Sequence, residues 1–591
     1  MFKSMFDKQS ILENKDQATL NCLVGELFVE VLVRLGLDLV VTAPGSRSTP
    51  ITLASARNDK VKCLSILDER SAAFYALGAA KATGKPVLLV CTSGTAAANF
   101  FPAVIEAKMS SVPLIVVSCD RPFELHDRSA EQTIDQLRLF GNYAVGFYEF
   151  GLPEASASYA DYLRQSLVHA FSQSLGIVRG PVHINLPFRD PVYVSGMDIS
   201  DTDRSEFFSQ FATVIGKITE CSQASLSVDA LLLEKLASHK KGLILVGNAQ
   251  ELSHQESAIE SLSEISDKLA WPIVADVLNP LRNHQNKFHH LITGYDWFLR
   301  SEKRSKDLQP KAVLQVGALP TSKDLRKWLK GAEAFHFILG NGLENKDPLN
   351  ALSVPLRGTL DSLAFQLKSS TPDGDWLSAW SEADEGAQNQ LEDKLKEFDI
   401  DFEGAIAHTL SKSLAEGSQV CLANSMSVRY AELLWKKNDS QTRVFCNRGA
   451  NGIDGTVSTA LGIAETGKPS VLLTGDLAFL HDSNALLNAG NHRLDLTILL
   501  VNNQGGGIFE HLPIASDAHF ENYFATPQAV DYSSLCAALS VPYKQISSRQ
   551  ALDKALNSIS GQGIRVFEIK TDRKKDVKTL HMIRSLFTDN T

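Results

Sequence analysis

Residues that could hold a divalent metal ion end two apolar runs in the last third of the chain. Gly475 and Asp476 end the run PSVLLTGD, and Asn503 follows 27 residues after Asp476 in LLVNNQGGG. A carboxylate, an amide oxygen and the backbone carbonyl of Gly505 are oxygen ligands of the kind that Mg²⁺ binds, commonly together with a phosphate. Each segment is also typical of an ordinary strand end or turn, so these residues alone leave the metal site open.

Glu69 is the acid that could exchange a proton. It lies in LSILDERSAAFYALGAAKATG, after an apolar run and before a segment of small residues. Desolvation raises the proton affinity of a partly buried carboxyl group and suits it to proton transfer near neutral pH. Taken alone, the acid is more typical of a helix cap or an exposed position. The small-residue turn TSGTAAANF at 92–100 is similarly open, because close packing of a helix on a sheet also needs small residues.

An alternation of strand-like and helix-length segments must position these residues. The apolar runs of the first part are LDLVVTA, CLSIL, PVLLVCTSG, PLIVVSCD and GPVHINLP, and those of the middle part are GLILVGN, WPIVADV, AVLQVGA and AFHFILG. The last part has QVCLANS, RVFCNRG, PSVLLTGD, LTILLVNN and RVFEIKT, after a charged segment over 371–398 that predicts a helix. The pattern predicts an α/β protein of three domains, 1–198, 199–400 and 401–591, with parallel sheets flanked by helices. Ligands of such sheets bind beyond the carboxyl ends of the strands.

Charge and composition narrow the class of protein. The chain carries 58 Lys+Arg against 68 Asp+Glu, a net charge of -10, which argues against nucleic acid or an anionic membrane as the main partner. No segment has the apolar core of a signal peptide or the roughly 18 apolar residues of a membrane span. The eight scattered cysteines contain no CxxC pair and indicate free thiols in a reducing compartment. We therefore expect a cytoplasmic protein without membrane insertion.

Several motifs resemble those of a known family. GDL at 475–477 with VNN at 501–503 is similar to the diphosphate and metal signature of thiamine-diphosphate-dependent enzymes, with Leu477 in place of the usual third glycine. APGSRSTPIT, CDRPFEL, NSMSVR and NRGANGIDG resemble segments of the 2-succinyl-5-enolpyruvyl-6-hydroxy-3-cyclohexene-1-carboxylate synthases of menaquinone biosynthesis. The matching motifs lie in both outer domains, and the middle domain matches only loosely.

The resemblance implies a fold, two cofactors and a reaction. The first domain would bind the pyrimidine of thiamine diphosphate and the third its diphosphate, with Mg²⁺, or alternatively Mn²⁺, as the metal. The implied transferase activity is decarboxylation of 2-oxoglutarate and conjugate addition of the succinyl carbanion equivalent to isochorismate. The family forms each site between two subunits, so a homodimer or homotetramer is expected.

The resemblance also assigns roles to single residues. Glu69 would bond the pyrimidine N1′ and promote proton transfer from thiazolium C2, and Ile453 would hold the cofactor bent. The remaining cofactor and metal residues would be Gly475, Asp476, Asn503, Gly505, Ile508 and Phe509. The substrate carboxylates would be bound by Ser46, Arg47, Arg121, Gln132, Lys323, Ser425, Arg429 and Arg448. The chain departs from the family pattern at Glu131 and Asp324, where asparagine and arginine are usual, so the isochorismate side is less fully matched.

Two other readings stay open at this point. Another thiamine-diphosphate enzyme, such as a 2-oxoacid decarboxylase or an acetolactate synthase, would share Glu69, Asp476 and Asn503. A non-catalytic nucleotide-binding or regulatory protein could use the same fold, although retention of the acid and the metal residues argues against it.

Overall fold

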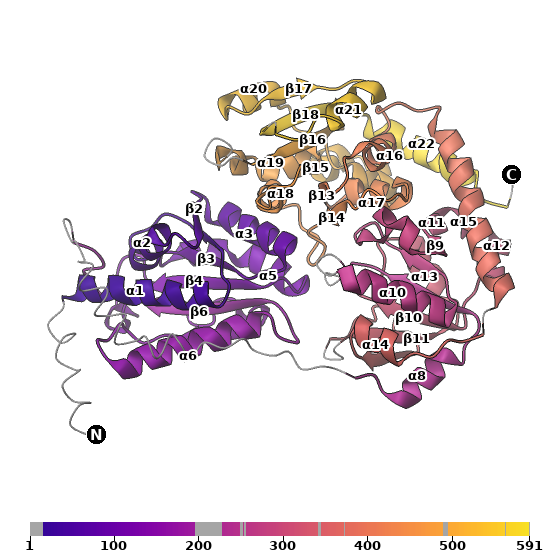
Figure 1. Cartoon of the computed structure of the whole chain (residues 1–591). Coiled ribbons are helices and arrows are strands. Elements are labelled where there is room, and N and C mark those ends of the chain that lie inside the picture. Colours follow the sequence, from indigo (N-terminus) through magenta and orange to yellow (C-terminus); the bar gives the residue numbers. More distant parts are fainter. Residues whose placement is uncertain are drawn as a thin grey trace. The chain divides into compact units, whose positions relative to one another are not determined.

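The computed structural model describes residues 16–194, 227–248, 252, 256–340, 344–371, 373–488, 494–561 and 563–589. It contains three six-stranded sheets in which every strand pairing is parallel, and helices flank each sheet (Figure 1). The chain forms two compact units. One holds the described residues up to 194 together with Gly449–Asn451 and Leu461–Ile463, and the other holds the rest.

The first sheet has the strand order β2-β1-β3-β4-β6-β5. Its core strands are apolar on both faces, as expected where helices cover a parallel sheet on each side; β3 and β4 are buried throughout. The strands are β1 (Leu39–Thr42), β2 (Lys62–Ser65), β3 (Val87–Cys91), β4 (Leu114–Asp120), β5 (Gly146–Glu149) and β6 (Pro181–Pro187). The helices are α1 (Gln17–Arg34), α2 (Thr49–Arg57), α3 (Glu69–Thr83), α4 (Thr95–Asn99), α5 (Phe101–Met109) and α6 (Ala157–Ser174).

The middle sheet has the order β12-β11-β10-β7-β8-β9. Its strands are β7 (Gly242–Val246), β8 (Ile273–Ala275), β9 (Leu291–Ile292), β10 (Ala312–Val316), β11 (Phe335–Gly340) and β12 (Ser353–Arg357). Its helices are α8 (Ala230–Ala237), α10 (Glu256–Leu269), α11 (Tyr295–Phe298), α12 (Glu302–Asp307), α13 (Lys323–Lys330) and α14 (Leu360–Gln366). The charged segment predicted as a helix is α15 (Gly374–Leu395).

The third sheet has the order β14-β13-β15-β16-β18-β17, which repeats the order of the first sheet strand for strand. Its strands are β13 (Gln419–Leu422), β14 (Arg443–Phe445), β15 (Ser470–Gly475), β16 (Leu496–Asn502), β17 (Tyr543–Gln545) and β18 (Ile564–Lys570). Its helices are α16 (Glu403–Ser413), α17 (Met426–Leu434), α18 (Thr456–Ala464), α19 (Asp476–His481), α20 (Tyr532–Ala538), α21 (Arg549–Leu556) and α22 (Arg573–Ser585). In both sheets the strand order reverses between the first and third strands, where ligands of open parallel sheets bind.

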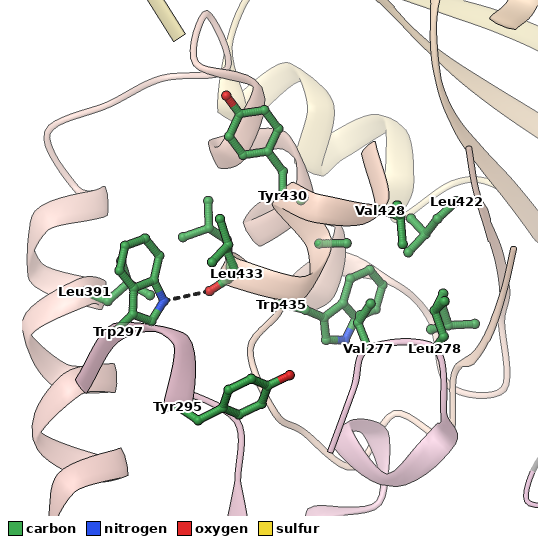
Figure 2. Packing of buried hydrophobic residues seen from close by; sticks show 14 of the residues in the cluster. Val277, Leu278, Tyr295, Trp297, Leu391, Leu422, Val428, Tyr430, Leu433 and Trp435 are labelled. Carbon is green, nitrogen blue, oxygen red and sulfur yellow. Dashed lines mark hydrogen bonds between the residues drawn. The ribbon is translucent and has the colours of Figure 1, made fainter. Parts of the chain in front are cut away.

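The middle and third sheets share one hydrophobic core. Figure 2 shows Trp297 of α11 donating from Nε1 to the carbonyl of Leu433 on α17, at 2.9 Å. A buried ion pair lies in the same region, where Arg282 Nη2 is 2.7 Å from Glu432 Oε1. Glu432 also accepts from the Val277 backbone N–H and the Tyr295 hydroxyl. Side chains of the middle domain therefore fix α17, which begins directly after Ser425.

The expected α/β fold with three parallel sheets is confirmed. The predicted boundary at 198/199 lies outside the described residues, the one at 400/401 falls between α15 and α16, and both stay predictions. Free thiols are found as expected at Cys63, Cys91, Cys119 and Cys536, whereas Cys221 lies outside the described residues. None of the described helices is long and apolar enough to cross a membrane.

Candidate active site

The predicted metal ligands come together at the carboxyl ends of β15 and β16. Asp476 is 2% exposed, its Oδ1 accepts from the Leu477 N–H at 2.8 Å, and its Oδ2 accepts from the Gly505 N–H at 2.8 Å. Asn503 follows β16 and is 8% exposed. The Gly505 carbonyl, predicted as a third ligand, accepts from the Gly507 N–H at 2.9 Å and keeps its second lone pair.

This arrangement fits a cation. Burial raises the pKa of Asp476 to about 6, although the two backbone hydrogen bonds act in the opposite direction. Asn503 Oδ1 is buried and has no hydrogen-bond partner among the described residues. A buried acceptor without a donor is costly, and a hard cation next to both oxygens would satisfy it.

The turn after β16 requires glycine at position 505, because of its backbone conformation and its close packing. Gly505 has φ of 128°, and a Cβ atom there would lie 2.2 Å from the Ala525 carbonyl oxygen. Leu477, which replaces the usual third glycine of the motif, lies inside α19 and has a helical backbone that any residue adopts. The substitution therefore leaves the Asp476 turn unchanged.

Arginines collect at the carboxyl ends of β13 and β14. Arg429 Nη1 donates to the Ser425 carbonyl at 2.5 Å, so these two predicted substrate-binding residues are in contact through the Ser425 backbone. Arg448 Nη1 donates to Asn424 Oδ1 at 3.1 Å. Burial lowers the pKa of Arg429 to about 10, and the positive charges of Arg448 and Arg326 act in the same direction. Ser425 has φ of 71°, an uncommon backbone for a residue with a side chain and one that often marks functional sites.

The sequence analysis missed Asn424, which organises this region. Its Nδ2 donates to the carbonyls of Asn447 at 2.6 Å and Gly452 at 2.8 Å, so one side chain holds both ends of the loop that follows β14. Its Oδ1 accepts from Arg448. The residue stands in the quoted motif NSMSVR directly before Ser425. Its place in that motif was the available signal.

Arg326 of α13 is a second residue that sequence reasoning missed. Its Nε and Nη2 donate to the carbonyls of Pro320 at 2.8 Å and Leu319 at 3.1 Å. Burial lowers the pKa of Arg326, and the nearby Arg448 adds to the effect. Within the part of the chain that the structure describes, Arg326, Arg429 and Arg448 form no ion pair.

The two middle-domain residues singled out from the sequence lie differently. Lys323 and Asp324 are exposed at the start of α13. Asp324 forms an ion pair with Arg300, which also pairs with Asp296 at 3.0 Å. The acid that departs from the family pattern is thus neutralised by a neighbouring arginine.

A second group of predicted residues lies at the carboxyl edge of the first sheet. The Arg47 backbone N–H donates to Thr92 Oγ1 at 3.2 Å, and Gln132 Nε2 donates to the Ser93 carbonyl at 3.0 Å. A Cβ atom at Gly45 would lie 2.3 Å from Thr92 Cβ, so the loop after β1 can approach the loop after β3 only as glycine. These contacts join APGSRS, TSGT and the segment after DRP.

The two arginines at this edge, Arg47 and Arg121, differ in how many hydrogen bonds and ion pairs they form. Arg47 is 3% exposed, donates to the Phe188 carbonyl at 2.7 Å and pairs with Asp190 at 2.8 Å, while its Nε is buried with no partner among the described residues. Burial lowers the pKa of Arg121, and the charge of Arg47 adds to this effect. Arg121 Nε donates to the Glu131 carbonyl at 3.4 Å. Ser46 is exposed beside this group.

Glu69 is the first residue of α3 and is half-buried. The neighbouring Asp68 caps the helix by accepting from the Ser71 N–H at 3.0 Å. The cap predicted as an alternative role for Glu69 is therefore supplied by Asp68, and no hydrogen bond to the Glu69 carboxylate is found within the described ranges.

The apolar residues of the predicted site are partly buried in the third domain. Ile453 directly follows Gly452, whose carbonyl accepts from Asn424, and the Ile453 carbonyl accepts from Thr456 Oγ1 at 2.7 Å. Ile508 packs against the shared core. Phe509 contacts Phe524 edge to face, with ring centroids 5.9 Å apart. The structure thus gathers the predicted residues into groups at the carboxyl ends of the first and third sheets.

Comparison with known proteins decides the family. Profiles of the thiamine pyrophosphate enzymes match along the chain: the N-terminal TPP binding domain at residues 23–139, the middle domain at 221–422 and the C-terminal TPP binding domain at 425–569. The 2-succinyl-5-enolpyruvyl-6-hydroxy-3-cyclohexene-1-carboxylate synthase of Gloeothece citriformis is 43% identical over 97% of this chain and 99% of its own length. The chain belongs to this synthase family.

Other members of the family give the same result. The synthases of Trichodesmium erythraeum and Rippkaea orientalis are 42% and 40% identical over 95% and 96% of this chain, and each is covered over 97% of its length. The family depends on thiamine pyrophosphate, also called thiamine diphosphate, and on a divalent metal. The buried oxygens of Asp476 and Asn503 fit that metal, for the reasons given above.

Proposed function

We propose that this chain catalyses the reaction for which its relatives are named. It would decarboxylate 2-oxoglutarate and add the succinyl unit to isochorismate, giving 2-succinyl-5-enolpyruvyl-6-hydroxy-3-cyclohexene-1-carboxylate in menaquinone biosynthesis. The observation that carries this choice of substrate class is the group of Arg326, Arg429 and Arg448, which forms no ion pair within the described residues.

Substrate charge explains the need for this group. Both proposed substrates carry two carboxylates, and a protein with a net charge of -10 binds them only through a concentrated positive site. Guanidinium groups suit carboxylates because their donors match both oxygens. We assign Arg429 with Ser425 to the distal carboxylate of 2-oxoglutarate, and Arg448 and Arg326 to neighbouring carboxylates. Arg326 would then supply the middle-domain cation, because Lys323 is exposed.

The other groups complete the proposed site. Asp476, Asn503 and the Gly505 carbonyl would hold Mg²⁺ or Mn²⁺ against the cofactor diphosphate, and Ile453, Ile508 and Phe509 would shape the apolar wall. Bound thiamine diphosphate supplies the electron sink that decarboxylation of a 2-oxoacid requires. Glu69 would hold a proton at the pyrimidine N1′. Arg47, Arg121, Gln132 and Ser46 would bind the second substrate.

We further propose a cytoplasmic enzyme with a homodimer as its minimum assembly. The proposal rests on the family resemblance, in which each site is shared between two subunits. It also rests on the division of the predicted residues between the first and third domains. Sedimentation of the purified protein, with and without cofactor, measures the assembly state.

The test of function is product identification. Purified protein is incubated with thiamine diphosphate, Mg²⁺, 2-oxoglutarate and isochorismate, and the product mass is determined; reactions lacking each component are the controls. We expect a product equal in mass to the two substrates less CO₂. Release of CO₂ without that product would favour a simple 2-oxoacid decarboxylase, and no reaction under any condition would favour the non-catalytic alternative.

A further inference from the structure

A buried carboxylate lies directly behind the proposed metal ligand Asn503. Glu403, the first residue of α16, is 8% exposed. Its Oε1 accepts from Asn503 Nδ2 at 2.5 Å and from Thr571 Oγ1 at 3.4 Å. The contact joins residues 100 positions apart in the chain. It links the start of the third domain to the turn that follows β16.

This contact fixes the orientation of the Asn503 amide. The two ends of an amide have nearly the same size, but one only donates and the other only accepts hydrogen bonds. Turning the Asn503 amide over would place Oδ1 against Glu403 Oε1, an acceptor against an acceptor. The Glu403 contact therefore keeps Nδ2 on the Glu403 side and leaves Oδ1 on the other. That Oδ1 is the buried atom without a partner among the described residues.

The surroundings hold both side chains in place. A Cβ atom at Gly507 would lie 2.8 Å from Asn503 Nδ2, so the turn is closely packed on that side. The Glu403 backbone N–H donates to Asp576 Oδ1 at 3.0 Å, and Asp576, in the first turn of α22, is 3% exposed. Asp576 thus caps α16, whose own preceding residue gives no side-chain cap. The first turns of α16 and α22 are thus joined at Glu403, and this contact positions the residue that carries the carboxylate.

We propose that Glu403 is a positioning residue for the metal site, which orients the Asn503 amide so that Oδ1 faces the cation. The inference rests on the proposed function, since it takes Asn503 as a metal ligand. Partners behind a ligand commonly set its orientation, and their loss typically lowers metal affinity by about 10- to 100-fold. The alternative is that Glu403 only satisfies a buried amide and serves folding.

The experiment measures Mn²⁺ affinity, in the presence of thiamine diphosphate, from the electron paramagnetic resonance signal of free Mn²⁺. In Glu403→Gln the new amide can donate as well as accept, so the Asn503 amide is no longer held in one orientation. We expect Mn²⁺ to bind about 10- to 100-fold more weakly. Asp384→Asn on α15 is the matched control, because Asp384 is also buried and accepts from two backbone N–H groups. It should keep the Mn²⁺ affinity of the wild type.

A second substitution makes the test independent of any folding defect. Asn503→Asp alone sets a carboxylate against Glu403 and should bind Mn²⁺ weakly. Combined with Glu403→Gln it restores a donor facing an acceptor, so the double variant should recover affinity to within a few-fold of the wild type. Unchanged affinity in Glu403→Gln, or no recovery in the double variant, overturns the inference. If the wild type itself fails to bind Mn²⁺ with thiamine diphosphate, the proposed function fails instead.

Discussion

Replacing Arg429 by methionine is expected to weaken the enzyme's substrate choice while making the protein without substrate more stable. Methionine keeps much of the side-chain volume and removes the charge. Arg429 is partly buried near Arg448 and Arg326, and no acid forms an ion pair with it within the described residues. The guanidinium charge of Arg429 therefore destabilises the folded protein when no substrate carboxylate is bound.

The size of the stability effect follows from the pKa. Burial, with the neighbouring arginines, lowers the pKa of Arg429 to about 10, against an ordinary value of about 12.5. Because the folded pKa lies below the unfolded one, the penalty is fully present at every pH below about 10, including pH 7. Its upper bound is about 3 kcal/mol. Solvent screening and the lost hydrogen bond to Ser425 reduce the expected gain to about 1 kcal/mol.

The effect on catalysis has the opposite sign. A hydrogen bond to a charged group contributes about 1.5–3 kcal/mol, so kcat/KM for 2-oxoglutarate should fall by about 10- to 150-fold. Pyruvate lacks the distal carboxylate, so kcat/KM for pyruvate should change little.

The assay combines denaturant unfolding without substrate and initial rates of CO₂ release with each 2-oxoacid. Arg565→Met is the control, since Arg565 of β18 is also buried and donates to a backbone carbonyl; it should keep the preference for 2-oxoglutarate. Equal loss with both 2-oxoacids, together with lower stability, would refute the assignment and leave Arg429 a role in folding.

Five further substitutions test other parts of the structure. Asp476→Ala should weaken the binding of Mg²⁺ and of thiamine diphosphate together, because the metal would join this carboxylate to the diphosphate. Titration of the apoenzyme with cofactor at fixed Mg²⁺ measures the affinity, and an affinity equal to that of the wild type would exclude this metal site. Glu69→Gln should slow deuterium exchange at C2 of the bound cofactor, and unchanged exchange and turnover would remove Glu69 from its proposed role. Arg326→Met should lower kcat/KM for the dicarboxylate substrates, whereas Lys323→Met, at an exposed position, should not; equal effects would contradict the choice between them. Glu432→Ala should reduce the free energy of unfolding by about 3–5 kcal/mol, because a buried guanidinium loses its partner; a denaturant curve like that of the wild type would argue against the buried pair.

The sheets could be predicted from the sequence mainly where strands are buried on both faces. Runs such as LIVVSCD and LTILLVN are mostly apolar and predict strands that the structure contains. The strands that the sequence analysis missed are β5, β9, β12 and β17, and each lies at the edge of its sheet. Strands β5, β12 and β17 are partly exposed, so their residues need not be apolar, whereas β9 is a buried pair of residues too short to give a pattern. The pattern YKQ of β17, mostly exposed, carries no strand signal.

The site was predictable only where motifs carry it. Asp476 and Asn503 were found because a strand end and a short turn repeat a known spacing. Asn424 and Glu403 act through contacts with positions 28 and 100 residues away, which the local sequence does not reveal. Of the two, only Asn424 stands in one of the recognised motifs. The motif match pointed to Lys323 at the start of α13. In the structure Lys323 is exposed, and the partly buried Arg326 is the side chain near Arg448.

Helix α17 carries Arg429 in its first turn and Glu432 in the next, and Glu432 is held by Arg282, Tyr295 and the backbone of Val277 in the middle domain. This constrains the making of chimeras between relatives. A recombination breakpoint between the middle and third domains would separate α17 from the residues that hold it, even though it joins two intact sheets. Segments 275–297 and 426–434 should therefore be exchanged as one block. A hybrid that takes only one of them is expected to lose carboxylate recognition along with stability.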